Sequence, residues 1–90
     1  MFDVEVVVRL AEHNNPKNRV YIRKNIKLPF APFPGLGLII DSEEFHIKSE
    51  LDDSVYWHHE TCKFVVYVHH YCDDVKWSKS WLVDDYGWSE

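Results

Sequence analysis

The fold is decided by the stretch Lys63-Phe64-Val65-Val66-Tyr67-Val68-His69-His70-Tyr71. Its β-branched and aromatic residues, uninterrupted by glycine or proline, predict one long strand. Successive side chains of a strand point to opposite faces, so Phe64, Val66 and Val68 share one face and are expected in the core. The opposite face then carries Tyr67 and Tyr71.

The predicted strand keeps the two cysteines apart. Cys62 and Cys72 stand at its two ends, and at about 3.3 Å per residue they lie roughly 30 Å from each other. A disulfide needs Cα atoms within about 7 Å. We therefore expect two free thiols, which suit a reducing compartment.

The same strand argues against a metal site. Two spacings in this region resemble zinc-ligand motifs, His59-x-x-Cys62 and His69-x-x-Cys72. A turn over residues 60–63 leaves His59 and His69 roughly 16 Å apart, whereas zinc ligands lie about 2.0–2.3 Å from one metal. We expect no metal and no cofactor, although a site that includes distant residues such as His46 or His13 stays open.

Further strands extend outward from this one. Alternating apolar residues predict strands over residues 2–10, 19–28, 36–40, 45–51 and 55–59. We expect the first two to form a hairpin around a polar loop. We expect the last to form a second hairpin with the strand that ends at Tyr71.

A proline-rich crossing separates the second and third of these strands. It reads Leu28-Pro29-Phe30-Ala31-Pro32-Phe33-Pro34-Gly35-Leu36. Its prolines exclude a helix and remove sheet donors. We expect a turn at Pro34-Gly35, a second turn over residues 41–44, and a plug of Phe30 and Phe33 at one end of the core.

This crossing resembles the LPF-x-P-x-x-GL motif of small uncharacterised bacterial and phage proteins. In that group two further strands carry a V-x-W element, here Val55-Tyr56-Trp57, and the chain closes on a Gly-Trp pair, here Gly87-Trp88. The resemblance implies a bacterial or viral source. It implies no activity, and no functional residue comes with it.

The tail predicts one short helix. Ser78 is a capping candidate and Gly87 a stop signal. We expect this helix to cover the face that carries Tyr56, Tyr67 and Tyr71 and to form a second small core there. If that face is open instead, it is an apolar patch of the kind that marks a protein interface.

These elements define a single domain over residues 1–90. The fold class is mainly β (α+β), with about six short antiparallel strands and one short C-terminal helix. The strands are expected to form a twisted sheet or a small open barrel that resembles SH3-like barrels. Such an architecture does not imply a function.

Composition excludes several classes of protein. The 90 residues are 46% hydrophobic with three glycines and four prolines, which excludes a disordered chain. No apolar run reaches the roughly 20 residues of a membrane span, and Asp3 and Glu5 stand where a signal peptide is basic. No phosphate loop, paired-carboxylate or serine-triad signature is present. We therefore expect a cytoplasmic protein that is not an enzyme.

Charge points to a protein partner. The net charge is −5, and the acids gather in the second half of the chain, in Asp52, Asp53, Asp73, Asp74, Asp84 and Asp85. The first hypothesis is a non-enzymatic protein-binding module, either a homodimer or an inhibitor of the phage anti-defence (anti-CRISPR-like) type. Its acidic surface would occupy a basic groove of the partner. The Tyr56, Tyr67 and Tyr71 face is the second candidate contact surface.

Two alternatives belong to other classes. A single-strand nucleic-acid-binding barrel would use a basic strand with one aromatic residue, through Arg19, Tyr21, Arg23, Lys24 and Lys27. A metal- or thiol-dependent protein would use Cys62 with His58, His59 and Glu60. We rank nucleic acid below a protein partner, and the metal or thiol class last.

Overall fold

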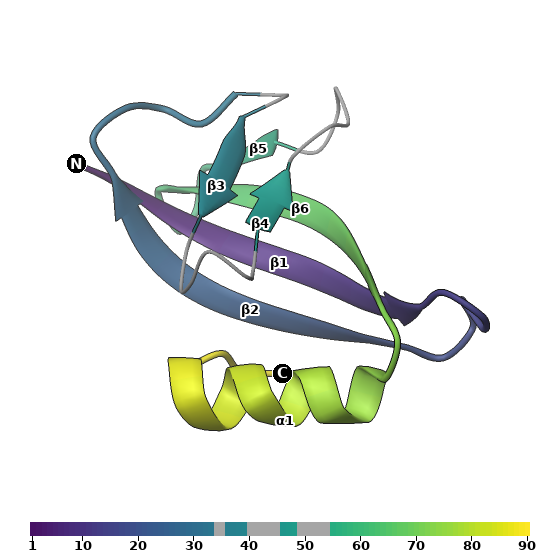
Figure 1. Ribbon diagram of the computed structural model, residues 1–90. Coiled ribbons are helices and arrows are strands. Elements are labelled where there is room, and N and C mark those ends of the chain that lie inside the picture. Colours follow the sequence, from purple (N-terminus) through teal and green to yellow (C-terminus); the bar gives the residue numbers. More distant parts are fainter. Residues whose placement is uncertain (34–35, 40–45, 49–54) are drawn as a thin grey trace.

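The computed structural model describes residues 1–33, 36–39, 46–48 and 55–90. Its elements are β1 (Phe2–Glu12), β2 (Arg19–Leu28), β3 (Gly37–Ile39), β4 (His46–Lys48), β5 (Val55–His58), β6 (Lys63–Cys72) and α1 (Val75–Tyr86). Four strands form one sheet in the order β2-β1-β6-β5, and β3 and β4 form a separate pair. In Figure 1 that pair lies in front of the sheet, and α1 runs below β2.

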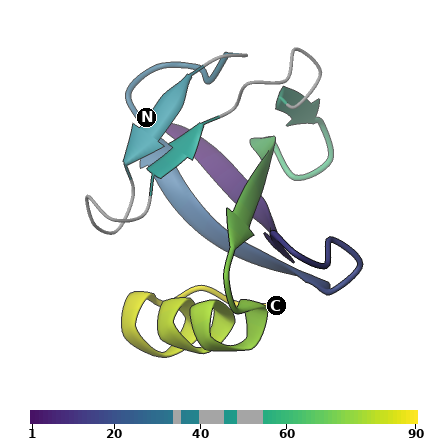
Figure 2. The same cartoon turned by 45° about the vertical axis from the view of Figure 1, so that its right-hand side comes forward.

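Strand β1 is central and has a different kind of partner on each side. It pairs antiparallel with β2, from Phe2 opposite Leu28 to Ala11 opposite Arg19. It pairs parallel with β6, from Val4 opposite Phe64 onward. The sheet is therefore mixed. Figure 2 shows β1 between β2 and the β5–β6 hairpin, with α1 at one side of the sheet.

The mainly β class, the C-terminal helix and both predicted hairpins are confirmed. The expectation that about six antiparallel strands form one twisted sheet or small open barrel is wrong in the direction and grouping of the strands, because the six described strands form two sheets. The main sheet has four strands, is mixed and stays open. Alternation tells which face a residue occupies, but it is the same for a parallel and an antiparallel neighbour, so it could not give the direction of β6.

One face of the sheet holds the core, and we call it the helix face. Its strand residues come from even-numbered positions of β1, β2 and β6, and α1 and the segment after it supply the cover. The buried cluster consists of Val4, Val6, Val8, Leu10, Ile22, Val66, Val68, Leu82 and Trp88. The helix therefore packs on the side that Phe64, Val66 and Val68 were predicted to face.

The helix begins one turn earlier than predicted. Asp74, not Ser78, is the N-cap, and its Oδ1 accepts a hydrogen bond from the backbone N–H of Trp77 at 3.0 Å. Gly87 ends the helix in the left-handed region, with φ of 76°. Past this turn, Ser89 exchanges two backbone hydrogen bonds with Arg23 of β2, at 2.7 and 3.0 Å, which directs the intervening tryptophan into the core.

The prediction of an aromatic plug is wrong. Phe30 and Phe33 do not plug the core, since both are exposed and contact each other at 6.3 Å between ring centroids. Trp57, which lies opposite Phe64, is half exposed. The β5–β6 turn also comes one residue earlier than predicted, because His59 lies in it.

Some predictions fall outside the described residues. They are the turn at Pro34-Gly35, the turn at 41–44, and the outer parts of the predicted strands at 36–40 and 45–51.

Candidate functional site

The face opposite the helix face carries four exposed tyrosines, and we call it the tyrosine face. They come from three strands and are Tyr21, Tyr56, Tyr67 and Tyr71. Between 45% and 51% of each side chain is exposed. The prediction that the C-terminal helix covers this face is wrong, because Leu82 of the helix and Trp88 after it pack on the other side of the sheet.

An apolar floor lies beneath the tyrosines. Val7 of β1 is 5% exposed and Val65 of β6 is 6% exposed, although no helix lies over them. Val7 pairs with Tyr67, and Val65 pairs with Tyr56. The rings of Tyr56 and Tyr67 meet edge to face, with centroids 5.7 Å apart. The tyrosines thus shield the floor and hold one another in place, while each ring keeps a surface open to solvent.

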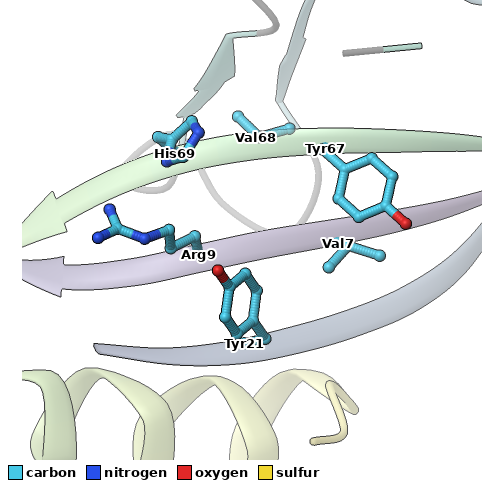
Figure 3. Close-up of a pocket in the computed structure, with 6 residues that line it drawn as sticks. All are labelled: Val7, Arg9, Tyr21, Tyr67, Val68 and His69. Carbon is cyan, nitrogen blue, oxygen red and sulfur yellow. The ribbon is translucent and has the colours of Figure 1, made fainter. Parts of the chain in front are cut away.

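A small cavity opens on the tyrosine face. Its volume is about 230 Å³, and it is lined by Val7, Arg9, Tyr21, Tyr67, Val68 and His69. Figure 3 shows the ring of Tyr67 beside Val7 and the ring of Tyr21 beside Arg9, whose guanidinium extends away from Tyr67. Arg9 and His69 are paired across β1 and β6, so the parallel pairing brings them together.

Basic side chains surround the tyrosines. Five on the same face come from β1, β2 and β6, namely Arg9, Arg19, Arg23, Lys27 and Lys63. Lys24, which belonged to the predicted basic strand, points the other way. Its Nζ donates a 2.7 Å hydrogen bond to the backbone oxygen of Tyr86 and lies 5.8 Å from the ring centroid of Trp88. It therefore supports the helix and does not belong to the tyrosine face.

Two carboxylates partly offset these cations. Glu5 lies 4.0 Å from Arg23 and 3.4 Å from Lys63, and Asp3 lies 3.8 Å from Lys27. Cations outnumber carboxylates among the paired strand residues of this face, so the face is net positive within a chain whose net charge is −5.

Arg9 has an open guanidinium. Its contact is a hydrogen bond of 3.4 Å to the backbone oxygen of Pro16. In the described part of the chain no carboxylate lies within ion-pair distance of it. A guanidinium has five N–H donors, and in Figure 3 that of Arg9 extends away from the ring of Tyr67.

The predicted acidic surface is divided. Asp73 and Asp74 precede α1, and Asp84 and Asp85 lie in its last turn. A helix of 12 residues separates such ends by roughly 16 Å. Asp74 also uses one carboxylate oxygen as the helix cap. The remaining pair of the hypothesis, Asp52 and Asp53, lies outside the described residues.

The cysteine and histidine motifs do not assemble. Cys62 and Cys72 are free; the Sγ of Cys62 donates to the backbone oxygen of His59 at 3.4 Å, and that of Cys72 to Ala11 at 3.6 Å. Within the described ranges, no three histidine, cysteine, aspartate or glutamate residues are close enough to hold a metal ion.

Other histidines lie at the end of β6. The ring of His13 stacks on Tyr71 with centroids 5.8 Å apart. Burial lowers the pKa of His70, and the nearby His13 lowers it further.

The described residues contain no helix with the length and apolar character of a membrane span.

Sequence reasoning found the tyrosines and the basic strand but treated them as separate surfaces. It missed Arg9 and His69, whose positions beside Tyr21 follow from the neighbours of β1. A usable signal was the shared odd parity of Arg9, Tyr21, Tyr67 and His69. The chain matches no protein-family model, no curated protein and no solved structure.

Proposed function

We propose that the protein binds single-stranded nucleic acid on the tyrosine face. The observation that carries the proposal is the gathering of half-exposed tyrosines and arginines on one open sheet face. The tyrosines would stack on bases, and the cations would contact the phosphate backbone. The nucleic-acid hypothesis is thus ranked above the protein-binding hypothesis. Its binding surface includes the tyrosines of β5 and β6 in addition to the basic strand.

Stacking is supported by the exposure of the rings. A base has an apolar face that any aromatic side chain can cover, and each such contact contributes about 1–3 kcal/mol by alanine substitution. Tyr21 and Tyr67 lie on the two strands that flank β1, Tyr21 beside Arg9 and Tyr67 beside the buried Val7. A flat sheet with exposed aromatics is also a known way to hold two or three unstacked bases of RNA.

Charge favours a polyanion over a protein with a basic surface. Arg19 and Arg23 lie on the tyrosine face, whereas Asp84 and Asp85 lie on the helix, on the other side of the sheet. Exposed charges are largely screened beyond about 8–10 Å at physiological salt. A nucleic-acid strand bound on the tyrosine face therefore experiences mainly the positive potential of that face, although the whole protein is acidic.

The test is fluorescence anisotropy with a labelled single strand. An oligonucleotide of about 12 nucleotides suits the known site sizes, and RNA and DNA of the same sequence form the two arms. We expect binding that weakens with salt, with a slope of about −2 in log–log form if three phosphates are neutralised. A duplex of the same length should bind more weakly, because its bases are already stacked.

Variants separate the face from the rest of the chain. The double change Tyr21→Ala and Tyr67→Ala removes two stacking surfaces and should cost at least about 2 kcal/mol, or roughly 30-fold in affinity. Trp77→Ala is the matched control, since this exposed tryptophan stacks on Trp81 of the helix. Its affinity should equal that of the unchanged protein.

Other results would contradict the proposal. No binding of either strand at low salt would do so, as would a double variant that binds as well as the Trp77 control. Sedimentation of the protein alone adds a further outcome. A dimer that dissociates in the double variant, without oligonucleotide binding, would assign the face to self-association.

A further inference from the structure

Two arginines of the tyrosine face lack a carboxylate partner. Arg23, Lys27 and Lys63 of the same face each lie 3.4–4.0 Å from a carboxylate oxygen. In the part of the chain that the structure describes, no carboxylate lies within that distance of Arg9 or Arg19. The chain has 15 acidic and 10 basic residues, so a lack of acids does not explain the difference. The unneutralised charge of the face is therefore concentrated where these two arginines lie.

The register of the sheet makes Arg9 and Arg19 neighbours. Arg19 lies opposite Ala11, and Ala11 is two residues beyond Arg9 on β1, so the two arginines are diagonal neighbours roughly 7–8 Å apart. Ala11, which adjoins both, has only a methyl side chain. The Arg9 guanidinium extends away from Tyr67 (Figure 3) and is bonded to Pro16, in the loop that leads into β2 at Arg19. Two positive charges at this spacing repel each other, and a bound anion would remove that repulsion.

The carboxylate nearest to Arg9 in the sequence is turned away from the pair. Glu12 follows Ala11 on β1, so its side chain points to the helix face. Its Oε1 accepts hydrogen bonds from the Nδ2 of Asn18 at 2.7 Å and from the backbone N–H of Val75 at 3.3 Å. This carboxylate is therefore engaged elsewhere, and the arginine pair is open to an anion from outside the chain.

The chemistry of the pair fits a phosphate with two charges. Guanidinium groups bind phosphate oxygens through parallel N–H donors. An internal phosphate of a nucleic-acid strand carries one negative charge, whereas a terminal phosphate monoester carries about −1.5 to −2 at pH 7 and has three free oxygens. Two guanidiniums match the terminal group in charge and in the number of donors.

The position of the pair also fits the end of a strand. Arg9 and Arg19 lie where β1 ends and β2 begins, beside the hairpin loop. A nucleic-acid strand that runs along the sheet reaches the edge of the tyrosine face there. Tyr71 lies on the other side of Ala11 from Arg19 and is 49% exposed, so it offers the adjoining base a stacking surface.

We infer that Arg9 and Arg19 bind a terminal phosphate of the nucleic-acid strand. This inference rests on the proposed function, because it assigns one end of the strand to one end of the same face.

The experiment compares three unlabelled uridine heptamers as competitors of the labelled strand. One has a 5′-phosphate, one has a 3′-phosphate, and one has hydroxyls at both ends. An exposed ion pair contributes about 1.4- to 5-fold in affinity, so two contribute roughly 2- to 30-fold. Since Arg9 is partly buried, at least one phosphorylated heptamer should bind 3-fold or more tighter than the hydroxyl heptamer, with that factor on the order of the ion-pair estimate. The arm that gains identifies which end of the strand lies at the arginines.

Variants separate the arginine pair from the general charge of the face. Arg19→Gln and Arg9→Gln should each reduce the preference for the phosphorylated heptamer. Lys27→Gln is the matched control, because this cation lies on the same strand as Arg19 but at the other end of the face, beside Asp3. It should lower the affinity for all three heptamers by the same factor. Circular dichroism of each variant reports whether the fold is retained.

The outcomes separate the two proposals. If no heptamer competes with the labelled strand and that strand itself does not bind, the proposed function fails and the inference fails with it. If all three compete equally, the face binds single strands but the terminal-phosphate site is refuted. If Lys27→Gln reduces the preference as much as Arg19→Gln does, the gain comes from added charge alone and the site is refuted as well. The comparison of the three heptamers with the unchanged protein stands even if an arginine variant does not fold.

Discussion

Replacing Trp88 by alanine should destabilise the protein more than changes at other tryptophans. Trp88 is 2% exposed and is the largest fully buried side chain among the described residues. It packs against the valines of β1 and under Lys24, whose Nζ lies 5.8 Å from its ring centroid. A buried tryptophan removes roughly 200 Å² from water, which at about 25 cal/mol per Å² corresponds to about 5 kcal/mol. Measured Trp→Ala changes in cores cost about 3–5 kcal/mol.

A loss of this size is a large part of the stability of a small domain, about 5–15 kcal/mol. It should lower the melting temperature by at least about 12 °C, at roughly 4–8 °C per kcal/mol for a chain of this length. The assays are thermal melting for the temperature and urea unfolding for the free energy, both followed by circular dichroism, which does not depend on the deleted fluorophore. Trp77→Ala is the control, because Trp77 is 63% exposed. If the two variants differ by less than about 1 kcal/mol, the side chain is not the core residue described above.

Four further variants, at three positions, test the helix ends and the pH dependence. Asp74→Ala should lower the free energy of unfolding by about 1 kcal/mol, because it removes the cap on Trp77; an unchanged urea midpoint would contradict the cap. Gly87→Ala should cost about 1–2 kcal/mol from backbone strain alone, since φ is 76° and an added Cβ meets nothing within 4 Å; Gly87→Asn should cost less. Burial and then His13 lower the pKa of His70, so near pH 6 the unfolded chain binds more protons than the folded one. Stability should therefore fall as the pH drops through about 6.5, and His70→Gln should flatten that dependence in urea titrations at several pH values; an unchanged slope would count against it.

The sequence predicted which residues face the core but not how the strands are arranged. The alternation of β6 correctly assigned Val66 and Val68 to the buried face, because side-chain direction is a local property of a strand. The direction and order of strands depend on long-range pairing, which leaves no periodic mark in the chain. The helix start was missed for a local reason, since Asp74 competes with Ser78 as a cap and both are good caps.

In the candidate site too, the directions of the side chains were predicted and the arrangement of the elements was not. The tyrosines of β6 were assigned to the correct face, yet the prediction that the helix covers them was wrong. The helix has one apolar side, which carries Val75 and Leu82. That side packs against the core on the helix face, so no apolar side is left to cover the tyrosines. The cavity could not be foreseen, because it needs Tyr21 and Tyr67 on either side of β1, and the sequence did not show that β1 lies between β2 and β6.

The position of β1 between an early and a late partner has a consequence for biosynthesis. Its pairing with β2 closes a short polar loop, but its pairing with β6 must wait until residues 63–72 have been made. Until then the hairpin has an open edge along the valines of β1, with no cover from Leu82 or Trp88. Unpaired apolar edges are the usual starting point of aggregation. The vulnerable period of this protein is therefore its time on the ribosome, and nascent chains that stop before β6 are the species a chaperone would need to hold.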